Sequence, residues 1–421
     1  MLRFGPNRWW QVAALFLMSA ACEAKENVEP SGAPGSSPPA PSETVLGITV
    51  LLEDSLHLVR GRRVGLITNH TGRDGSGTPT IDLLWEHPEV DLVALFSPEH
   101  GIRGAVEAGE KIDSQTDERT GLPIHSLYGE SLRPTETMLE GIDILAFDIQ
   151  DIGARYYTYL STMAVSMEEA GAHRIPFLVL DRPNPIGSRA QGNILEPEFS
   201  SFVGMYPTPM RHGLTAGEFA RLAVGAFGVD VDLTVVPMRH WDGSMSLEET
   251  GLPWTPPSPN IPTPESALHY PGTCLFEGTN LSVGRGTDRA FQHVGAPWLD
   301  GDALAEGLNH LGLPDTVFEG VRFTPTEPGD GKFGGIEVGG VRVMATGPDY
   351  DPTKAALAML VHTRRASGEN WAWRPAHFDR LAGTDQLRRA LEAGGTYADL
   401  AAGWGEGLAE FQALAAPYRL Y

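Results

Sequence analysis

The sequence is organised around residues 143–159, which have the sequence DILAFDIQDIGARYYTY. The run 144–147 is short and apolar, as is typical of a buried strand. Acids, an amide, a glycine, an arginine and three tyrosines follow at once. Open α/β sheets bind ligands just beyond the carboxyl ends of their strands. The stretch therefore predicts the floor of a binding cleft; the alternative is a helix cap followed by an aromatic cluster that closes the core.

The same alternation extends on both sides of this stretch. Apolar runs predict strands at residues 64–68, 92–96, 144–148, 177–180 and 233–236. Helical patterns lie between them, at residues 80–86, 134–139, 159–170 and 215–224. Alternating strands and helices predict a parallel, Rossmann-like sheet. Polar clusters follow four of the strands, so we expect these clusters to converge on one edge of the sheet.

Nucleotide-binding motifs are missing from this sheet. No Gly-x-Gly-x-x-Gly sequence follows the first strand, and no Gly-Lys-Ser/Thr phosphate-binding loop occurs. The Gly-rich segment 284–287 is too short to identify a site. The sequence therefore predicts a Rossmann-like sheet that binds no dinucleotide, and no cofactor is expected.

A proline-rich segment, residues 253–264, predicts a stiff loop without regular structure. We place a domain boundary just after it, which gives a Rossmann-like catalytic domain at 47–265 and a smaller α+β domain at 266–421. The second domain opens with an irregular polar run, 270–287, which we expect to face the first domain across the cleft. The C-terminal tail has ordinary helical patterns and is assigned no chemistry.

The N-terminus predicts export. Residues 1–21 contain Arg3 and Arg8, an apolar run too short to span a bilayer, and small residues that end at Cys22. This pattern is similar to a lipoprotein signal in which Cys22 is lipidated, although Ser19 replaces the usual branched residue. Ordinary secretion is the alternative. Residues 22–46 are predicted to be a Pro/Ser/Gly-rich tether, which places the protein in the cell envelope, periplasmic or membrane-anchored.

The net charge is −23, and residues 1–21 carry two arginines and no acid, which leaves −25 for the remainder. This acidity argues against nucleic acid as a partner and against an anionic membrane surface, so membrane contact is expected only through the lipid anchor. An anionic ligand would need a local arginine pocket. The second cysteine, Cys274, is expected to be buried and to form no disulfide.

Taken in order, these segments resemble one family, the NamZ-type exo-β-N-acetylmuramidases of bacterial peptidoglycan recycling. The matching segments are GLITN (65–69), SPEHG (97–101), DIQDIGAR (148–155), DRPNP (181–185), HGLT (212–215), PSPN (257–260) and the run 270–287. The resemblance covers about residues 47–421. It implies a Rossmann-like domain, a smaller C-terminal domain, and release of terminal N-acetylmuramic acid (MurNAc) from the non-reducing end of peptidoglycan fragments.

Glycoside hydrolysis needs an acid and usually a second carboxylate. Glu99 is the expected acid, because it follows a strand in a loop between Pro98 and Gly101; Glu277, from the second domain, is the other candidate. Asp148 and Asp151 are candidates for the second carboxylate. The 2-acetamido group of MurNAc can itself attack the anomeric carbon, in which case an orienting aspartate replaces the nucleophile.

Substrate binding is assigned to polar and aromatic residues of the same loops. An arginine is expected to clamp the lactyl carboxylate of MurNAc, and tyrosines to stack on a sugar ring. The full predicted set is Asn69, His100, Arg103, Arg155, Tyr156, Tyr157, His212, Asn260, Asn280 and Arg285. Histidines in these loops lack close metal-ligand spacing, so no metal is expected.

Two other functions remain open at this point. A non-catalytic envelope lipoprotein that binds muropeptides would use the same cleft without an acid. A metal-dependent esterase on the same scaffold would be sensitive to chelators.

Overall fold

The computed structural model describes residues 43–99, 101–102 and 115–421, and Glu43–Tyr421 forms one compact unit. The predictions for the export signal, Cys22 and most of the tether lie outside the described residues, as do those for His100 and Arg103. Within the described ranges, no helix combines the length and apolarity that a membrane span requires.

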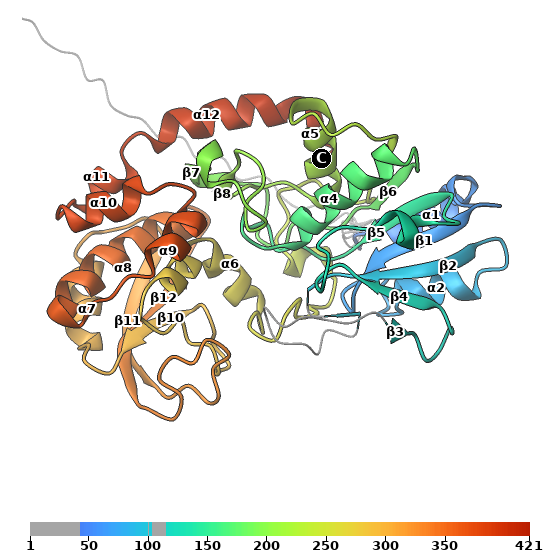
Figure 1. The fold of residues 1–421 in the computed structure, drawn as a ribbon. Coiled ribbons are helices and arrows are strands. Elements are labelled where there is room, and N and C mark those ends of the chain that lie inside the picture. The colour runs from blue at the N-terminus through green and yellow to red at the C-terminus, as the bar shows by residue number, and fades with distance from the viewer. Residues whose placement is uncertain (1–42, 100, 103–114) are drawn as a thin grey trace, which may run out of the picture. The chain divides into compact units, whose positions relative to one another are not determined.

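A seven-stranded sheet forms the core of the N-terminal half (Figure 1). Its order is β3 (Gln115–Thr116), β4 (Pro123–Ser126), β2 (Asp91–Ser97), β1 (Arg63–Thr68), β5 (Ile144–Asp148), β6 (Phe177–Leu180) and β9 (Leu233–Val236). All neighbouring pairs are parallel except β3 with β4. The chain builds outward from β1 to β4, then crosses to β5, so the strand order reverses between β1 and β5. The predicted Rossmann-like fold is confirmed.

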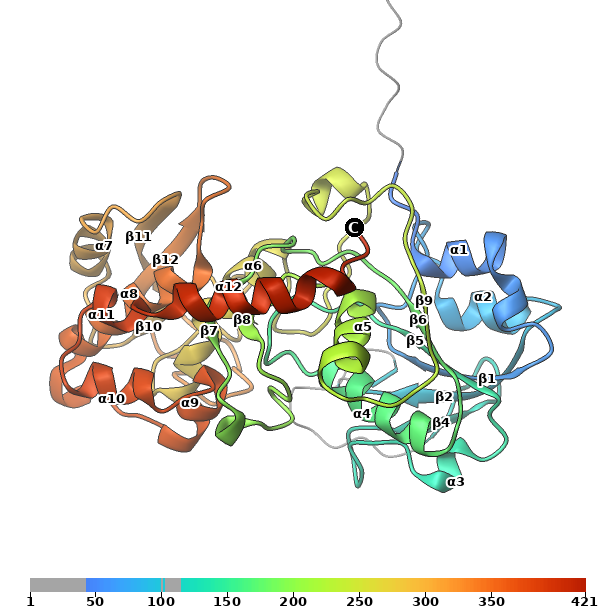
Figure 2. The same ribbon diagram turned by 90° about the horizontal axis from the view of Figure 1, so that it is seen from above.

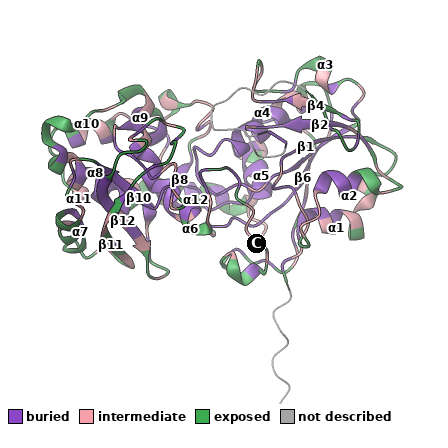
Figure 3. Cartoon of the chain, turned by 90° about the horizontal axis from the view of Figure 1, so that it is seen from below, coloured by how far each residue is buried: buried purple, intermediate pink, exposed green. Residues whose placement is uncertain are grey.

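Both faces of this sheet are covered, which explains why its strands are continuous apolar runs. In β5, Leu145 and Phe147 belong to one buried cluster, and Ile144 and Ala146 to another. Figure 3 shows the strands buried between more exposed helices. The helices of this half are α1 (Gly47–Asp54), α2 (Thr80–Glu86), α3 (Glu136–Leu139), α4 (Tyr159–Ala172) and α5 (Ala216–Ala226).

The C-terminal half has an antiparallel sheet with helices packed on it. Its strand order is β10 (His293–Ala296), β12 (Val338–Ala345) and β11 (Thr316–Phe323). A separate ribbon pairs β7 (Gln191–Ile194) with β8 (Pro209–Arg211). The helices are α6 (Pro264–Thr273), α7 (Gly301–Asn309), α8 (Pro352–Ser367), α9 (Pro375–Ala382), α10 (Gln386–Glu392), α11 (Tyr397–Ala401) and α12 (Trp404–Ala415).

Two predictions at the junction hold only in part: the segment 253–264 lacks regular structure up to residue 263, and the run 270–287 is irregular only in its later part. The run 270–287 is not irregular throughout, because α6 extends to Thr273 and a 3₁₀ helix continues over Cys274–Gly278. Helix α6 begins at Pro264, since Thr263 caps it by accepting from the Ser266 amide, and proline is tolerated in a first turn whose N–H groups have no helical partner.

The folded unit also begins before residue 47. The Thr44 amide donates to the Thr250 carbonyl at 3.2 Å, Val45 pairs with Arg239, and Leu46 is buried. Residues 44–46 therefore belong to the fold and not to the predicted tether.

Helix α12 carries the chain from the C-terminal half back to α5 (Figures 1 and 2). Beyond it, Arg419 Nη1 and the Leu420 amide each bind the Glu218 carboxylate at 3.0 Å, and the Tyr421 hydroxyl donates to Asp181 at 2.9 Å. The C-terminal tail therefore binds the C-terminal half to the N-terminal half. These contacts help to fix the position of one half against the other.

Candidate active site

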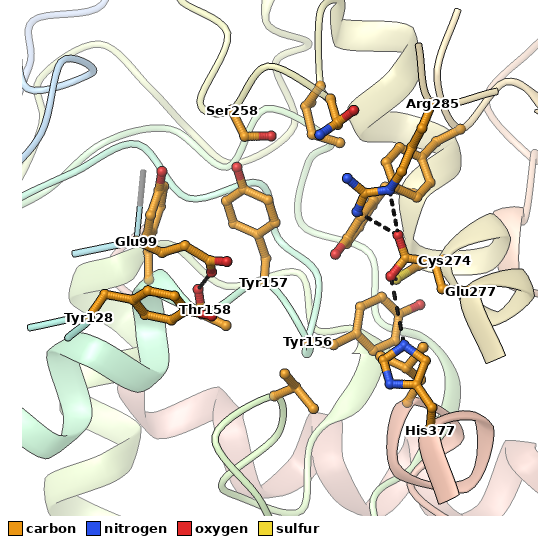
Figure 4. A pocket seen from close by; sticks show the side chains of 17 residues that line it. Glu99, Tyr128, Tyr156, Tyr157, Thr158, Ser258, Cys274, Glu277, Arg285 and His377 are labelled. Atoms are coloured by element: carbon orange, nitrogen blue, oxygen red, sulfur yellow. Dashed lines mark hydrogen bonds and ion pairs between the residues drawn. The ribbon is translucent and has the colours of Figure 1, made fainter. Parts of the chain in front are cut away.

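A cavity of about 150 Å³ lies between the two halves of the folded unit (Figure 4). The first half contributes Glu99, Tyr128 and residues 156–159. The proline-rich loop contributes Ser258, Asn260 and Ile261, and the second half contributes Tyr270, Cys274, Glu277, Arg285, Phe291, His377 and Leu381; Val203 completes the lining.

Glu99 stands on one wall, two residues beyond the end of β2. Ser97 pairs in register with Ser126 of β4, so Tyr128, two residues beyond Ser126, lines the same wall. The Thr158 hydroxyl donates to Glu99 Oε2 at 2.7 Å. Burial and the neighbouring Glu99 carboxylate raise the pKa of Tyr128 to about 12, so its hydroxyl keeps its proton and remains a donor.

Glu277 stands on the opposite wall, on the 3₁₀ helix that follows α6 (Figure 4). Arg285 donates Nε at 2.9 Å and Nη2 at 2.5 Å to the same oxygen, Oε1. His377 Nε2 lies 4.0 Å from the other oxygen, Oε2. Burial alone raises the pKa of Glu277, but the charge and hydrogen bonds of Arg285 outweigh burial and hold that pKa below its ordinary value. Glu277 is therefore ionised at neutral pH.

Cys274 is buried, as predicted, and lines the cavity beside Glu277. Its thiol lies 3.8 Å from Glu277 Oε2 and donates to it. Burial, followed by the charge of Glu277, raises the pKa of the Cys274 thiol well above its ordinary value. Because thiolate is the nucleophilic form, this protonated thiol is not set up for nucleophilic attack.

The tyrosines form a packed wall of the cavity. Tyr157 meets Tyr159 and Tyr270 edge to face, with ring centroids 5.0 and 5.7 Å apart, and the Tyr156 hydroxyl donates to the Pro271 carbonyl. Only 3% of Tyr156 and 7% of Tyr157 is exposed. Both line the cavity, but little ring face is free for the sugar stacking that the sequence suggested.

The proline-rich loop supplies an unused donor. Asn260 lines the cavity, and its buried Nδ2 has no hydrogen-bond partner among residues 43–99, 101–102 and 115–421. The loop itself is anchored, since the Tyr159 hydroxyl donates to the Pro257 carbonyl at 2.7 Å. A buried amide without a partner is costly, so Asn260 is suited to bind a ligand acceptor.

Neither predicted aspartate lines this cavity. Asp148 is fully buried and pairs with Arg182 at 2.5 Å, and the Thr80 hydroxyl also donates to it. These contacts leave no face of the carboxylate toward a substrate, so the proposal of Asp148 as nucleophile or base is not supported by its position.

Asp151 and His212 form a second buried pair outside the cavity lining. Asp151 Oδ2 accepts from the Gly153 amide at 2.7 Å and lies 3.7 Å from His212 Nε2. His212 Nδ1 accepts from the Leu214 amide at 3.1 Å. These contacts shape the loops after β5 and β8, and neither residue lines the cavity.

Three other predicted binding residues hold the backbone instead. Arg155 donates to the carbonyls of residues 193, 208, 381 and 382. Asn69 Oδ1 accepts from the Thr71 amide and hydroxyl, and Asn280 binds the backbone of residues 370 and 372. Arg155 is therefore a structural tie and not a clamp for a substrate carboxylate.

Four polar residues of the cavity lining were not predicted from the sequence: Tyr128, Thr158, Ser258 and His377. Thr158 and Ser258 lie within segments singled out by sequence, so proximity to those motifs was an available signal. Tyr128 follows the four-residue strand β4, and His377 lies in the first turns of α9, where no motif marks it.

Across the described ranges, no group of three or more His, Cys, Asp or Glu side chains is placed to hold a metal ion. In His212, Nδ1 accepts from the Leu214 amide and Nε2 lies 3.7 Å from Asp151, the one carboxylate within ion-pairing distance of this ring among the described residues.

Comparison with known proteins identifies the family. The model of the N-terminal domain of the exo-β-N-acetylmuramidase NamZ matches residues 64–265, and the model of its C-terminal domain matches residues 268–421. The chain belongs to the NamZ family. It is 44% identical over 378 residues to the peptidoglycan β-N-acetylmuramidase NamZ of Bacillus subtilis strain 168, a match that covers 89% of this chain and 91% of that protein. The family predicted from the ordered motifs is therefore confirmed.

Two solved structures have the NamZ-like fold of this chain. Both are DUF1343-family proteins of Bacteroides fragilis NCTC 9343. One has a TM-score of 0.84 at 37% identity, and the other a TM-score of 0.74 at 32% identity. Each match covers 90% of this chain and 99% of the solved chain.

Proposed function

We propose that this protein is an exo-β-N-acetylmuramidase that releases β-1,4-linked MurNAc from the non-reducing end of peptidoglycan fragments. Membership of the NamZ family and the likeness to the Bacillus subtilis enzyme support the reaction. The observation that carries the proposal is the placement of two carboxylates, Glu99 and Glu277, on opposite walls of one cavity. Glycosidases use such a pair across the scissile bond.

Glu99 is the proposed general acid. The Thr158 hydroxyl fixes one carboxyl oxygen, and the protonated Tyr128 hydroxyl lies beside the same side chain. Both of these neighbours are hydroxyl groups that can donate to the carboxyl oxygens of Glu99. An acid in this position delivers its proton to the glycosidic oxygen as the bond to the anomeric carbon breaks.

Glu277 is the proposed second carboxylate. Its lowered pKa keeps it charged, which suits a group that stabilises positive charge at the anomeric carbon or activates water, and does not suit the acid. Where the substrate acetamido group attacks instead, the same carboxylate is suited to orient that group. This assignment replaces Asp148 and Asp151 in the role expected from the sequence.

Recognition of the substrate carboxylate is assigned to Arg285. Its Nε and Nη2 are engaged by Glu277, but Nη1 makes no hydrogen bond within the described part of the chain. The guanidinium lies over the Phe291 ring, 5.3 Å from its centroid, which fixes its plane. Asn260 is the proposed partner for the acetamido or a hydroxyl oxygen.

The test is hydrolysis of a chromogenic MurNAc glycoside and its GlcNAc counterpart by wild-type protein and by Glu99→Gln. We expect release from the MurNAc glycoside only, and a fall in kcat of about 10²–10⁴-fold in the variant, the range for loss of one general acid. A natural MurNAc-terminated disaccharide should show the same loss.

The outcomes separate the alternatives. If Glu99→Gln still releases MurNAc, the protein has the activity of the family but another residue is the general acid. A folded wild-type protein that binds MurNAc-terminated fragments without turnover would instead be a binding lipoprotein of the envelope. Indifference to chelators would argue against a metal-dependent esterase.

We also propose that the protein is exported and anchored through Cys22. The observation behind this is the signal-like segment 1–21, which ends in Ser-Ala-Ala directly before Cys22. Metabolic labelling with a radioactive fatty acid should mark the wild-type protein and not Cys22→Ser, which should leave the membrane fraction. An unlabelled, soluble, exported wild-type protein would show ordinary secretion.

A further inference from the structure

A second and larger cavity, of about 750 Å³, lies away from the candidate active site and shares none of its lining residues. Helix α6 lies between them: Pro264, Glu265 and Leu268 line the second cavity, whereas Tyr270 and Cys274, beyond them, line the first. The volume falls in the range of small-molecule binding sites.

Arg211 is the buried charge of this cavity. It lies at the end of β8, and only 6% of the residue is exposed. Burial lowers the pKa of Arg211 to about 10, with a smaller opposing effect of Asp351, so the guanidinium stays charged at neutral pH. No carboxylate of the described chain lies within ion-pairing distance of it.

One edge of this guanidinium is occupied and the other is not. Nη1 donates to Gln191 Oε1 at 2.7 Å. Nε is buried without a partner among the described residues. Nη2 points toward Gly187, another residue of the cavity wall, and would lie 3.7 Å from a Cβ if Gly187 had one. The Nε–Nη2 edge is one that binds a carboxylate through two parallel hydrogen bonds.

The rest of the cavity wall contains both apolar and acidic side chains. Apolar side chains come from Ile186, Leu252, Trp254 and Leu268. Glu248, Glu249 and Glu265 also line it, but all three are exposed, where water screens their charge. The exposed Arg189 already faces Asp349, at 3.4 Å. A buried charge acts far more strongly than these exposed ones, so the site favours an anion at Arg211.

We propose that this cavity is a second binding site, which takes a small organic molecule with a free carboxylate on an amphipathic body. The carboxylate binds the Nε–Nη2 edge of Arg211, and the body packs against Trp254 and Leu268. The site stands apart from the proposed hydrolysis, since none of its residues lines the cavity that holds Glu99 and Glu277.

Two sources share this chemistry: the C-terminal carboxylate of a short peptide and the lactyl carboxylate of a muramyl sugar. The probes are acetyl-D-alanyl-D-alanine with its C-terminal amide, and free MurNAc with GlcNAc. Binding to the purified protein is measured by calorimetry, so the result does not depend on turnover.

We expect at least one of the two acids to bind wild type at least about tenfold more tightly than its uncharged analogue, a difference typical of a charge-assisted contact. Arg211→Gln should weaken that binding about tenfold. Arg189→Gln, which makes the same change on the rim of the same cavity, should alter it less than about threefold. Free MurNAc should in addition retain any binding at the first cavity in Arg211→Gln.

Ser188→Trp provides a second variant if Arg211→Gln does not fold. Ser188 is an exposed residue of the cavity wall, and a tryptophan there should block the cavity while Arg211 remains. The proposal is overturned if neither acid binds at 10 mM, if acid and analogue bind equally, or if Arg211→Gln and Ser188→Trp both bind as wild type does. Preference for the peptide acid or for the sugar acid identifies the source.

Discussion

Glu99 and Glu277 line the same cavity, but their neighbours give the two carboxyl groups different properties. The Thr158 hydroxyl donates to Glu99, whereas the charged guanidinium of Arg285 donates to Glu277. The charge and hydrogen bonds of Arg285 lower the pKa of Glu277, so Glu277 is ionised at neutral pH and is not suited to deliver a proton. Glu99 is the other carboxyl group in the described cavity lining, so the acid role is assigned to Glu99.

Replacement of Glu277 by Gln should lower kcat/KM by about 10²–10³-fold, the usual effect of removing one electrostatic group from an active site. Because Arg285 lowers the pKa of Glu277, this group is ionised at neutral and alkaline pH, and the loss should be similar across that range. The measurement is kcat/KM between pH 5 and 9 for wild type and Glu277→Gln.

The double variant Glu99→Gln/Glu277→Gln tests whether the two carboxyl groups act on the same bond. Losses from residues that act together in one step do not add, so we expect the double variant to lose little more activity than the more damaging single variant. The measurement is kcat/KM for the two single variants and the double variant. Losses that add in full would contradict the assignment of both residues to one step.

At the scale of secondary structure, one arginine joins three elements. The Arg155 guanidinium donates at 2.8 Å to the carbonyls of Asn193, in β7, and of Thr208, just before β8. It donates at 3.1 and 2.8 Å to Leu381 and Ala382, at the end of α9. Helix α9 carries His377, so Arg155 positions one wall of the candidate site without entering it.

Arg155→Met should therefore reduce the free energy of unfolding by about 3–5 kcal/mol, because it leaves buried carbonyls without donors. Denaturant unfolding measures this loss. Arg133→Met is the control, since Arg133 is half exposed and pairs with Glu168 and Glu169 at the surface; we expect a loss of about 1 kcal/mol or less there. Equal losses in the two variants would contradict a structural role for Arg155.

At the scale of the whole molecule, periodicity predicted the parallel sheet well. Strands such as β1 and β6 lie where their apolar runs predicted, because burial on both faces leaves a clear signal. The site was harder to predict, since it depends on contacts between distant segments. Asp148 and Glu99 both follow strands, but Arg182 neutralises Asp148 inside the protein, whereas Glu99 lines the cavity. The spacing of residues in the sequence does not show which acidic residue forms an ion pair with a buried arginine in the folded protein.

The contact between the C-terminal tail and Asp181 should make the stability of the fold depend on pH. The Tyr421 hydroxyl donates to Asp181, which also accepts from the Thr215 hydroxyl and the Gly217 amide. Burial raises the pKa of Asp181 to about 6, although these hydrogen bonds oppose the shift. Between about pH 4 and 6 the folded state therefore binds a proton that the unfolded state has lost, so this group makes stability fall as pH rises through 6.

Asp181→Asn removes that titration. Between pH 4 and 7 we expect the unfolding free energy of wild type to fall relative to the variant by on the order of 2–3 kcal/mol, the difference that a shift of about two pKa units implies. Denaturant unfolding of both proteins at several pH values isolates this difference from other titrating groups. The Tyr421 hydrogen bond favours the ionised Asp181 carboxylate. Tyr421→Phe removes this bond, so the midpoint of the pH-dependent change in stability should move to higher pH. A pH-independent difference between wild type and Asp181→Asn would show that Asp181 titrates alike in the folded and unfolded states, and a midpoint unchanged in Tyr421→Phe would show that the tail does not control it.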